Sequence, residues 1–265
     1  TLGNCPFEFF VSRVLHLRDP RPAYDAGGVR PFVLGQIQHA ILHTVYRGFL
    51  SRPVPGPEEI VQQVRHETRR FFSALGENTA GPYPLLWSIL SDRVENQLAA
   101  FVQRDVARLQ ADGYRPEKLE WALKAPMGGT PFYWTGRLDR VDRNPSTGRF
   151  MIIDYKNKIR KDPLLKRVLS GQIHQPPAYM ELMEGQGLGG EGSVRYEYLA
   201  SNASEELSDT DWRAQRGAIE ARRHELLSLV SAGQFLIHPT EGPNGHCQLC
   251  DFARACRKAH GPTRG

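Results

Sequence analysis

Two aspartates and a lysine fall on two β-rich segments, GRLDRVD and RFMIIDYK, that flank the turn sequence NPSTG. If the turn pairs Asn144 with Arg149, opposite residue numbers sum to 293 and Asp139 faces Asp154. Opposite Cβ atoms lie roughly 4.5–5.5 Å apart, so the two carboxylates would repel one another unless a cation lay between them. Lys156 shares the face of Asp154 because strand side chains alternate. These residue types predict a Mg²⁺ or Mn²⁺ site able to activate water at a phosphate, with the lysine orienting that water or stabilising the transition state.

The same residues also fit a plainer structure. An exposed hairpin with solvated charges would show the same pattern, because D…DxK occurs in many unrelated proteins. On a predicted helix upstream, His39 and His43 form an HxxxH pair that could hold a transition metal independently of the aspartates. Glu120, on the strand before the hairpin, is a weaker candidate because a glutamate on a strand is usually solvated.

The four cysteines form a second group with ligand chemistry. Cys247, Cys250 and Cys256 are spaced C-x2-C-x5-C, and Cys5 lies at the opposite end of the chain. One distant and three clustered thiolates suit a four-iron four-sulfur cluster, whereas structural zinc usually takes two ligands from each of two segments. We favour the cluster, with zinc and unligated thiols as alternatives. Because it would close almost the whole chain into a loop, we expect it to stabilise the fold.

Hydrophobic periodicity predicts the elements that carry these residues. The chain begins helical, becomes strand-rich from Lys118 and ends helical. Proline and glycine clusters mark most of the boundaries. Helices are predicted at 5–17, 32–49, 58–75, 84–111, 163–170, 175–187 and 211–232, and strands over LEWALKA, FYWTGRLDRVD, RFMIIDYK and VRYEYLA.

Composition narrows the class of protein. The 265 residues are 40% hydrophobic and carry a net charge of +5, a modest bias that suits a polyanionic partner. No apolar run is long enough to span a membrane and no leader opens the chain, so we expect a soluble cytoplasmic protein associated with the nucleoid. Because the chain begins with Thr1, we expect a piece of a longer polypeptide. The sequence has no G-x-x-x-x-G-K motif, which excludes ATP hydrolysis by a Walker-type loop.

The paired segments GRLDRVD and MIIDYK resemble the GxxDRxD…hhDYK signature of RecB/AddB-type nucleases in the PD-(D/E)XK superfamily. LGQIQH matches the family's Gly-x-x-x-His pattern with Gly35 and His39, and QPPAY matches its Gln-x-x-x-Tyr pattern. The cysteine frame resembles that of AddB and of the iron–sulfur nucleases associated with CRISPR systems and with replication. The resemblance covers nearly the whole chain, although residues 50–115 carry no recognisable motif.

The resemblance implies an α/β fold with a restriction-endonuclease-like core, in which helices flank a mixed central sheet. An N-terminal helical region and a C-terminal Fe–S-binding segment would complete it. We expect a single nuclease domain over residues 1–265. Its parts are a helical region with the first cysteine at 1–112, the nuclease core at 115–200, and the long helix with the cysteine cluster at 208–265.

The resemblance also implies residue roles. The metal ligands would be His39, Asp139, Asp154 and the carbonyl group of Tyr155, with Lys156 as the catalytic lysine. Gln175 and Tyr179 would orient the substrate or the lysine. Their alternative is a helix N-terminus followed by a core tyrosine. The cluster ligands would be Cys5, Cys247, Cys250 and Cys256.

Three hypotheses about function follow. The first is a Mg²⁺- or Mn²⁺-dependent exonuclease acting on single-stranded DNA ends in recombinational repair, as part of a helicase–nuclease whose motor lies elsewhere. The second is a catalytically silent DNA-binding or scaffold module in which only the Fe–S cluster or zinc matters. The third is a zinc protein that uses the cysteines, with or without the two histidines. Arginines at 212–224 would contact the DNA backbone or form a solvated helix face.

Overall fold

The computed structural model describes residues 2–17, 24–25, 28–29, 31–50, 52–79, 84–157, 159–188, 190–238, 247, 250–253 and 255–256. Contacts between residues divide the chain into two compact units. The unit that we call the sheet unit comprises Ala23–Lys161 and Ala178–Asp209. The unit that we call the cysteine unit comprises Thr1–Pro22, Asp162–Pro177 and Thr210–Gly265. That all of these residues form one domain stays a prediction.

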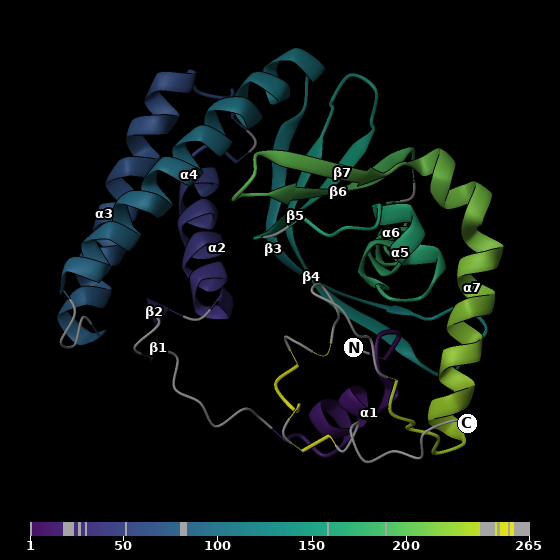
Figure 1. Cartoon of the computed structure of the whole chain (residues 1–265). Helices are drawn as coiled ribbons and strands as arrows, with labels where there is room; N and C mark the ends of the chain where they lie inside the picture. The colour runs from purple at the N-terminus through teal and green to yellow at the C-terminus, as the bar shows by residue number, and fades with distance from the viewer. Residues whose placement is uncertain are drawn as a thin grey trace. The chain divides into compact units, whose positions relative to one another are not determined.

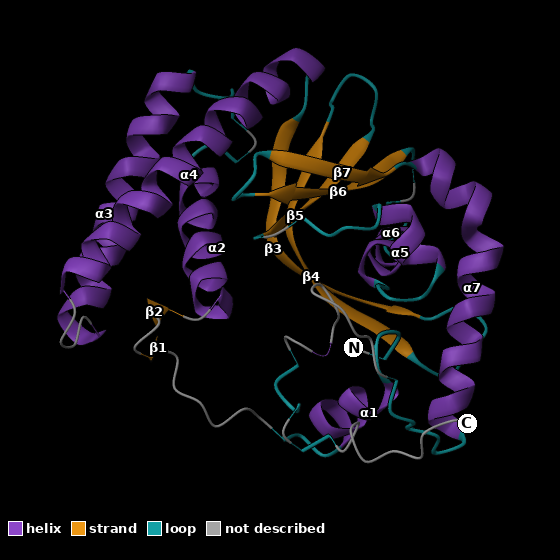
Figure 2. Cartoon of the chain, viewed as in Figure 1, coloured by secondary structure: helices purple, strands orange, loops and turns teal. Residues whose placement is uncertain are grey.

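A five-stranded mixed sheet forms the centre of the sheet unit (Figure 2). Its spatial order is the order of the chain: β3 (Arg115–Pro126), β4 (Tyr133–Arg143), β5 (Phe150–Lys156), β6 (Gly192–Tyr198) and β7 (Ala203–Leu207). β3, β4 and β5 form an antiparallel meander, β5 and β6 are parallel, and β7 returns antiparallel to β6. The predicted α/β class and mixed sheet are confirmed. A separate two-stranded ribbon pairs β1 (Tyr24–Asp25) with β2 (Gly28–Val29).

The predicted register between β4 and β5 is also confirmed. Arg140 pairs with Ile153 and Arg143 pairs with Phe150, so the numbers of opposite residues sum to 293. The turn fixes this register locally, because the side chain of Asn144 accepts hydrogen bonds from the backbone N–H groups at positions 146 and 147. Gly148 closes the turn with a φ of +72°, a left-handed conformation that favours glycine.

The two strands separate just beyond the last pair of this ladder, Arg140 and Ile153. β4 continues along β3 to its pair at Tyr133, whereas β5 follows β6 to its pair at Lys156. The strands therefore fork where the ladder would next have paired Asp139 with Asp154. A fork leaves backbone groups unpaired and opens room for side chains between strands.

Three helices of the sheet unit cover one face of the sheet (Figure 1). They are α2 (Pro31–Arg47), α3 (Pro57–Thr79) and α4 (Pro84–Asp112), and each begins with proline, whose fixed φ suits the first helical turn. Their apolar residues form one buried cluster with Met151 and Ile153 of β5. All three lie close to their predicted ranges. None of the described helices combines the length and apolar character that crossing a membrane would require.

Helix α6 (Gln175–Gly185) begins in the cysteine unit, and its remainder packs on β3 and β4 in the sheet unit. Two glycines allow the close approach. A Cβ atom on Gly136 would lie 2.9 Å from Cδ1 of Leu182, and one on Gly185 would lie 2.6 Å from Cβ of Ala125. The glycine of the GRLDRVD segment therefore has a packing role.

The cysteine unit holds α1 (Pro6–Phe9), α5 (Leu164–Leu169) and nearly all of α7 (Asp209–Ser231). The predicted helix over residues 5–17 is shorter than expected. A π-helical turn at Phe10–Val14 follows α1 directly, with the N–H of Leu15 donating to the carbonyl of Phe10 five residues back. Because His16 then adopts a φ of +54°, the chain leaves the helical path.

Candidate active site

Three side chains from different elements of the sheet unit meet at the fork. Potential ligand atoms of His39 on α2, Glu120 on β3 and Asp139 on β4 all lie within 4.8 Å of one another. We call these three residues the acidic group. The backbone N–H of Tyr155 donates a 3.0 Å hydrogen bond to Oδ2 of Asp139, so this carboxylate occupies the gap that opens between β4 and β5.

His39 lies between two of the predicted ligand atoms. Its Nδ1 is 3.4 Å from Oδ2 of Asp139, and its Nε2 is 3.2 Å from the carbonyl oxygen of Tyr155. Burial lowers the pKa of His39, but the hydrogen bond to Asp139 and the charges of Asp139 and Asp154 outweigh it, so the pKa is raised. An imidazole between two oxygen acceptors is suited to carry the positive charge that a bound cation would otherwise supply.

Asp154 lies beside this group, at the carboxyl end of β5. Its Oδ1 accepts a 3.0 Å hydrogen bond from the hydroxyl of Tyr179, and its Oδ2 is 2.5 Å from Nζ of Lys156. The lysine contact is a close ion pair. Burial raises the pKa of Asp154 and the charge of Asp139 raises it further, against the opposing charge of Lys156.

The oxygen and nitrogen atoms gathered here are suitable ligands for a divalent cation. Carboxylate and carbonyl oxygens are the ligands of Mg²⁺, and an added imidazole also suits Mn²⁺. Asp154 brings an almost completely buried carboxylate, and this burial raises its pKa. A buried acid whose pKa is raised by another acid gains from a cation placed between them. Which residues ligate a metal stays a prediction.

Glu120, the weaker candidate in the sequence, lies with His39 and Asp139 in the structure. It adopts a φ of +46°, a left-handed conformation that is uncommon for a non-glycine residue within a strand. The regular β3–β4 pairs lie on either side of it, and its carboxylate also forms a 2.9 Å ion pair with Arg137. The sequence did not predict this conformation, because strand alternation carries no information about a local reversal of φ.

His43 is not a member of the group of three potential ligands that His39 joins, and the alternative of a histidine pair stays a prediction. The glycine of the Gly-x-x-x-His pattern instead lies beside the end of β5. A Cβ atom on Gly35 would be 3.2 Å from Nδ2 of Asn157, one residue after Lys156.

The remaining predicted residues divide between the units. Tyr179 contacts Asp154, as described above. Gln175 is the first residue of α6 and belongs to the cysteine unit, so its predicted role near the lysine stays a prediction.

A second charged group is buried between the sheet and the helices. Arg140 and Asp142 on β4 interact with Asp105 and Arg108 on α4, through contacts of 2.8–3.0 Å. Two cations thus face two acids. We call these four residues the balanced group. Arg140 also donates to the hydroxyl of Tyr155, which anchors the residue between Asp154 and Lys156 to the helical core.

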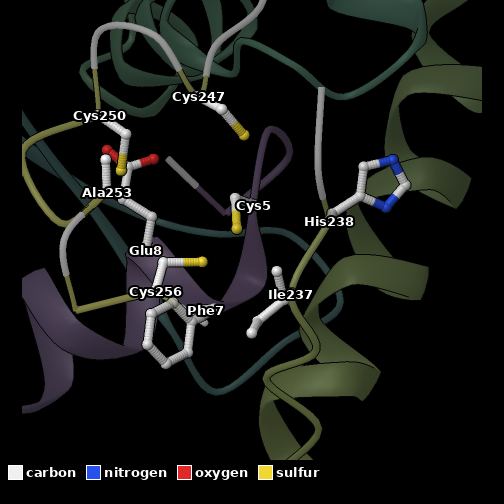
Figure 3. A pocket seen from close by; sticks show the side chains of 9 residues that line it. All are labelled: Cys5, Phe7, Glu8, Ile237, His238, Cys247, Cys250, Ala253 and Cys256. Atoms are coloured by element: carbon white, nitrogen blue, oxygen red, sulfur yellow. The ribbon is translucent and has the colours of Figure 1, made fainter. Parts of the chain in front are cut away.

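The four cysteines line one cavity in the cysteine unit (Figure 3). Phe7, Glu8, Ile237, His238 and Ala253 complete its lining. Cys5 is buried, the other three cysteines are partly exposed, and no disulfide joins them. The structure therefore brings together thiols from both ends of the chain, as the spacing predicted.

The sheet and the acidic group define a class: an α/β protein whose carboxylates and imidazole suit a divalent cation. This chain belongs to the PD-(D/E)XK nuclease superfamily, whose family model matches residues 1–257. Members of that superfamily are generally nucleases that use divalent metals.

Two other comparisons add little. No curated protein matches the chain significantly. Among solved structures, the crystal structure of SSO0001 aligns with 85% of this chain and 94% of its own, at 15% identity and a TM-score of 0.31. That score is too low to carry an argument about either fold or function.

Proposed function

We propose that this chain is a Mg²⁺- or Mn²⁺-dependent deoxyribonuclease of the RecB/AddB type. The observation that carries the proposal is the convergence of His39, Glu120 and Asp139 beside the buried carboxylate of Asp154. A catalytically silent module would have no need to keep these acids close together against their mutual repulsion.

The residues around the fork have distinct proposed roles. His39, Asp139, Asp154 and the Tyr155 carbonyl would hold the metal, with Glu120 as a further ligand. Once bound, the metal would supply Lewis-acid activation of water and neutralise charge on the phosphate.

Lys156 would act beside the metal ligands. Its ammonium group is anchored by Asp154 and lies 4.8 Å from the ring centroid of Tyr196. These contacts hold it at the carboxyl end of β5, where it would orient water or stabilise negative charge on the phosphate. Tyr179 would fix the orientation of the Asp154 carboxylate through its hydrogen bond. We propose that Gln175 helps to orient the substrate.

A digestion assay tests the nuclease proposal. End-labelled linear single-stranded DNA is incubated with Mg²⁺, Mn²⁺ or EDTA, using wild type, Asp154→Asn and the matched surface variant Asp162→Asn. We expect digestion only with a divalent metal, a loss of at least about a hundredfold for Asp154→Asn, and no loss for the control. Equal digestion by wild type and Asp154→Asn would remove the proposed site.

We also propose that the DNA substrate is a single-stranded end, supplied by a helicase subunit or domain during recombinational repair. The support is the resemblance together with the absence of a Walker motif from the sequence. Closed circular single-stranded DNA separates the modes of cleavage. An exonuclease leaves circles intact while it degrades the linear form, so rapid digestion of circles would show an endonuclease instead.

We propose that Cys5, Cys247, Cys250 and Cys256 hold a four-iron four-sulfur cluster. The support is the spacing of the cysteines, three close in sequence and one distant, which suits a four-iron four-sulfur cluster. All four line one cavity in the cysteine unit.

Metal analysis tests the cluster directly. Anaerobically purified wild-type protein should contain iron and acid-labile sulfide in equal amounts, near four of each per chain. Cys5→Ser should lower both. A protein that contains zinc and no iron would overturn the assignment, whether or not the variant folds.

A further inference from the structure

The β3–β4 hairpin leaves one face exposed beyond the acidic group. Burial alternates along both strands, so Leu123 and Ala125 are buried while the residues between and beside them are exposed. Positions 133, 135 and 137 of β4 are exposed in the same alternating way. Cross-strand pairing places these residues together, and we call the set the hairpin face: Ala122, Lys124, Pro126, Tyr133, Thr135 and Arg137.

The chemistry of the hairpin face is that of a surface for a polyanion. Its six positions hold two cations and no acid. Tyr133 is 58% exposed, and Nζ of Lys124 lies 4.6 Å from its ring centroid. An exposed aromatic ring with a cation beside it is an arrangement by which proteins stack an unpaired base and neutralise an adjoining phosphate.

The hairpin face is continuous with the acidic group. Arg137, whose side chain is 69% exposed, reaches Glu120 with a 2.9 Å ion pair. Tyr133 precedes Asp139 by six residues, a distance of about 20 Å along an extended strand. The face therefore extends from the proposed site over the length of several nucleotides.

From these contacts we propose that the hairpin face binds single-stranded DNA and leads it to the acidic group. Tyr133 stacks on a base, and Lys124 and Arg137 contact phosphates. The strand must be single, because in a duplex each base is already stacked on its neighbours and offers no free face to the tyrosine. This inference deepens the proposed function and rests on it.

Binding in EDTA tests the inference without cleavage. The affinity of each variant is measured by fluorescence anisotropy for an oligo-dT and for an abasic oligonucleotide of equal length. Tyr133→Ala should weaken oligo-dT binding at least about fivefold and leave abasic binding unchanged, whereas Tyr133→Phe should restore it. Leu86→Ala, which removes an exposed apolar side chain from α4, is the matched control and should bind like wild type.

The salt dependence of DNA binding tests the proposed contact between Lys124 and a phosphate. Lys124→Ala should reduce the slope of log affinity against log salt by about 0.7, the value for one phosphate contact with a single strand. An unchanged slope would remove Lys124 from the proposed track. Thermal melting of each variant checks that it is folded.

The outcomes separate the two proposals. Unchanged oligo-dT affinity in Tyr133→Ala, or equal losses for both oligonucleotides, would overturn the hairpin proposal even if the wild type cleaves DNA. A wild type that binds through Tyr133 but never cleaves would overturn the nuclease proposal and leave the hairpin face as a DNA-binding surface.

Discussion

The balanced group and the acidic group are two charged clusters that begin at adjacent residues of one strand. Asp139 belongs to the acidic group, while Arg140 and Asp142 belong to the balanced group. In the balanced group two arginines neutralise two aspartates away from solvent. In the acidic group and its neighbour Asp154, three carboxylates share Lys156, Arg137 and His39, and the pKa of Asp154 is raised.

The two groups differ in where their counter-charges lie. Arg140 and Arg108 are buried or nearly so beside their acids, whereas the side chains of Lys156 and Arg137 are 33% and 69% exposed. Although burial by itself would raise the pKa of Asp105, the charges of Arg140 and Arg108 hold it well below its ordinary value. Its charged form is therefore stabilised by the fold. Asp154 is destabilised as an anion, which is the condition that a bound cation relieves. Four predictions test this contrast.

The largest effect should come from unbalancing the balanced group. Asp142→Asn leaves Arg140 and Arg108 sharing one acid in a buried site, and we expect a loss of about 3–5 kcal/mol in the free energy of unfolding. Urea denaturation measures it. The exposed pair of Lys166 and Asp162 supplies the control, since Asp162→Asn should cost less than about 1 kcal/mol. Equal losses in the two variants would show that the buried balance is unimportant.

A smaller loss of stability should follow from filling the space beside Gly136, where Leu182 and Tyr179 pack. Gly136→Ala places a methyl group against Leu182, and we expect a destabilisation of about 1–3 kcal/mol. Because Tyr179 also lies next to this position, metal-dependent digestion should fall as well.

Gly148→Ala is the control, because it strains the turn between β4 and β5 without a contact to α6. It should reduce stability without reducing digestion at saturating DNA, and a parallel loss of digestion would contradict this.

Removing an acid from the acidic group should increase the stability of the fold, whereas removing one from the balanced group decreases it. In EDTA, Asp139→Asn should raise the free energy of unfolding by up to about 1 kcal/mol, because repulsion with the other carboxylates is relieved. The same variant should lose metal-dependent digestion. A destabilised Asp139→Asn would mean that this acid is structural, like those of the balanced group.

The smallest effect should appear in the pH dependence of stability without metal. The raised pKa of Asp154 means that the folded state takes up a proton at higher pH than the unfolded state does. Its contribution is therefore fully present below the unfolded pKa and is lost as pH rises through the folded pKa. Asp154→Asn should thus be more stable than wild type at pH 7, by a margin that narrows towards pH 4. A constant margin would contradict the raised pKa.

The residue patterns predicted His39, Asp139 and Asp154 together, but not the fork between the strands that carry the two aspartates. The turn sequence around Asn144 fixes the pairing of β4 with β5, so the register could be calculated from residue numbers. The fork could not, because it depends on β4 following β3 while β5 follows β6. The reversed backbone of Glu120 is likewise a tertiary effect.

Errors in the predicted elements also arise where the structure depends on contacts that the sequence does not show. Proline marks the starts of α2, α3 and α4, and their ranges were accordingly close. The break after α1 depends on a π-type hydrogen bond at Leu15, which no spacing of apolar residues signals. β7 was missed because ASEEL is polar and short, and only its pairing with β6 makes it a strand.

The placement of the cysteines has a consequence for biosynthesis. The cavity is lined by Cys5, which precedes the sheet unit in the sequence, and by Cys247, Cys250 and Cys256, which follow it. Every residue of the sheet unit has been synthesised before Cys247 appears. The cysteine unit therefore cannot close around its cavity until the whole sheet unit has been synthesised.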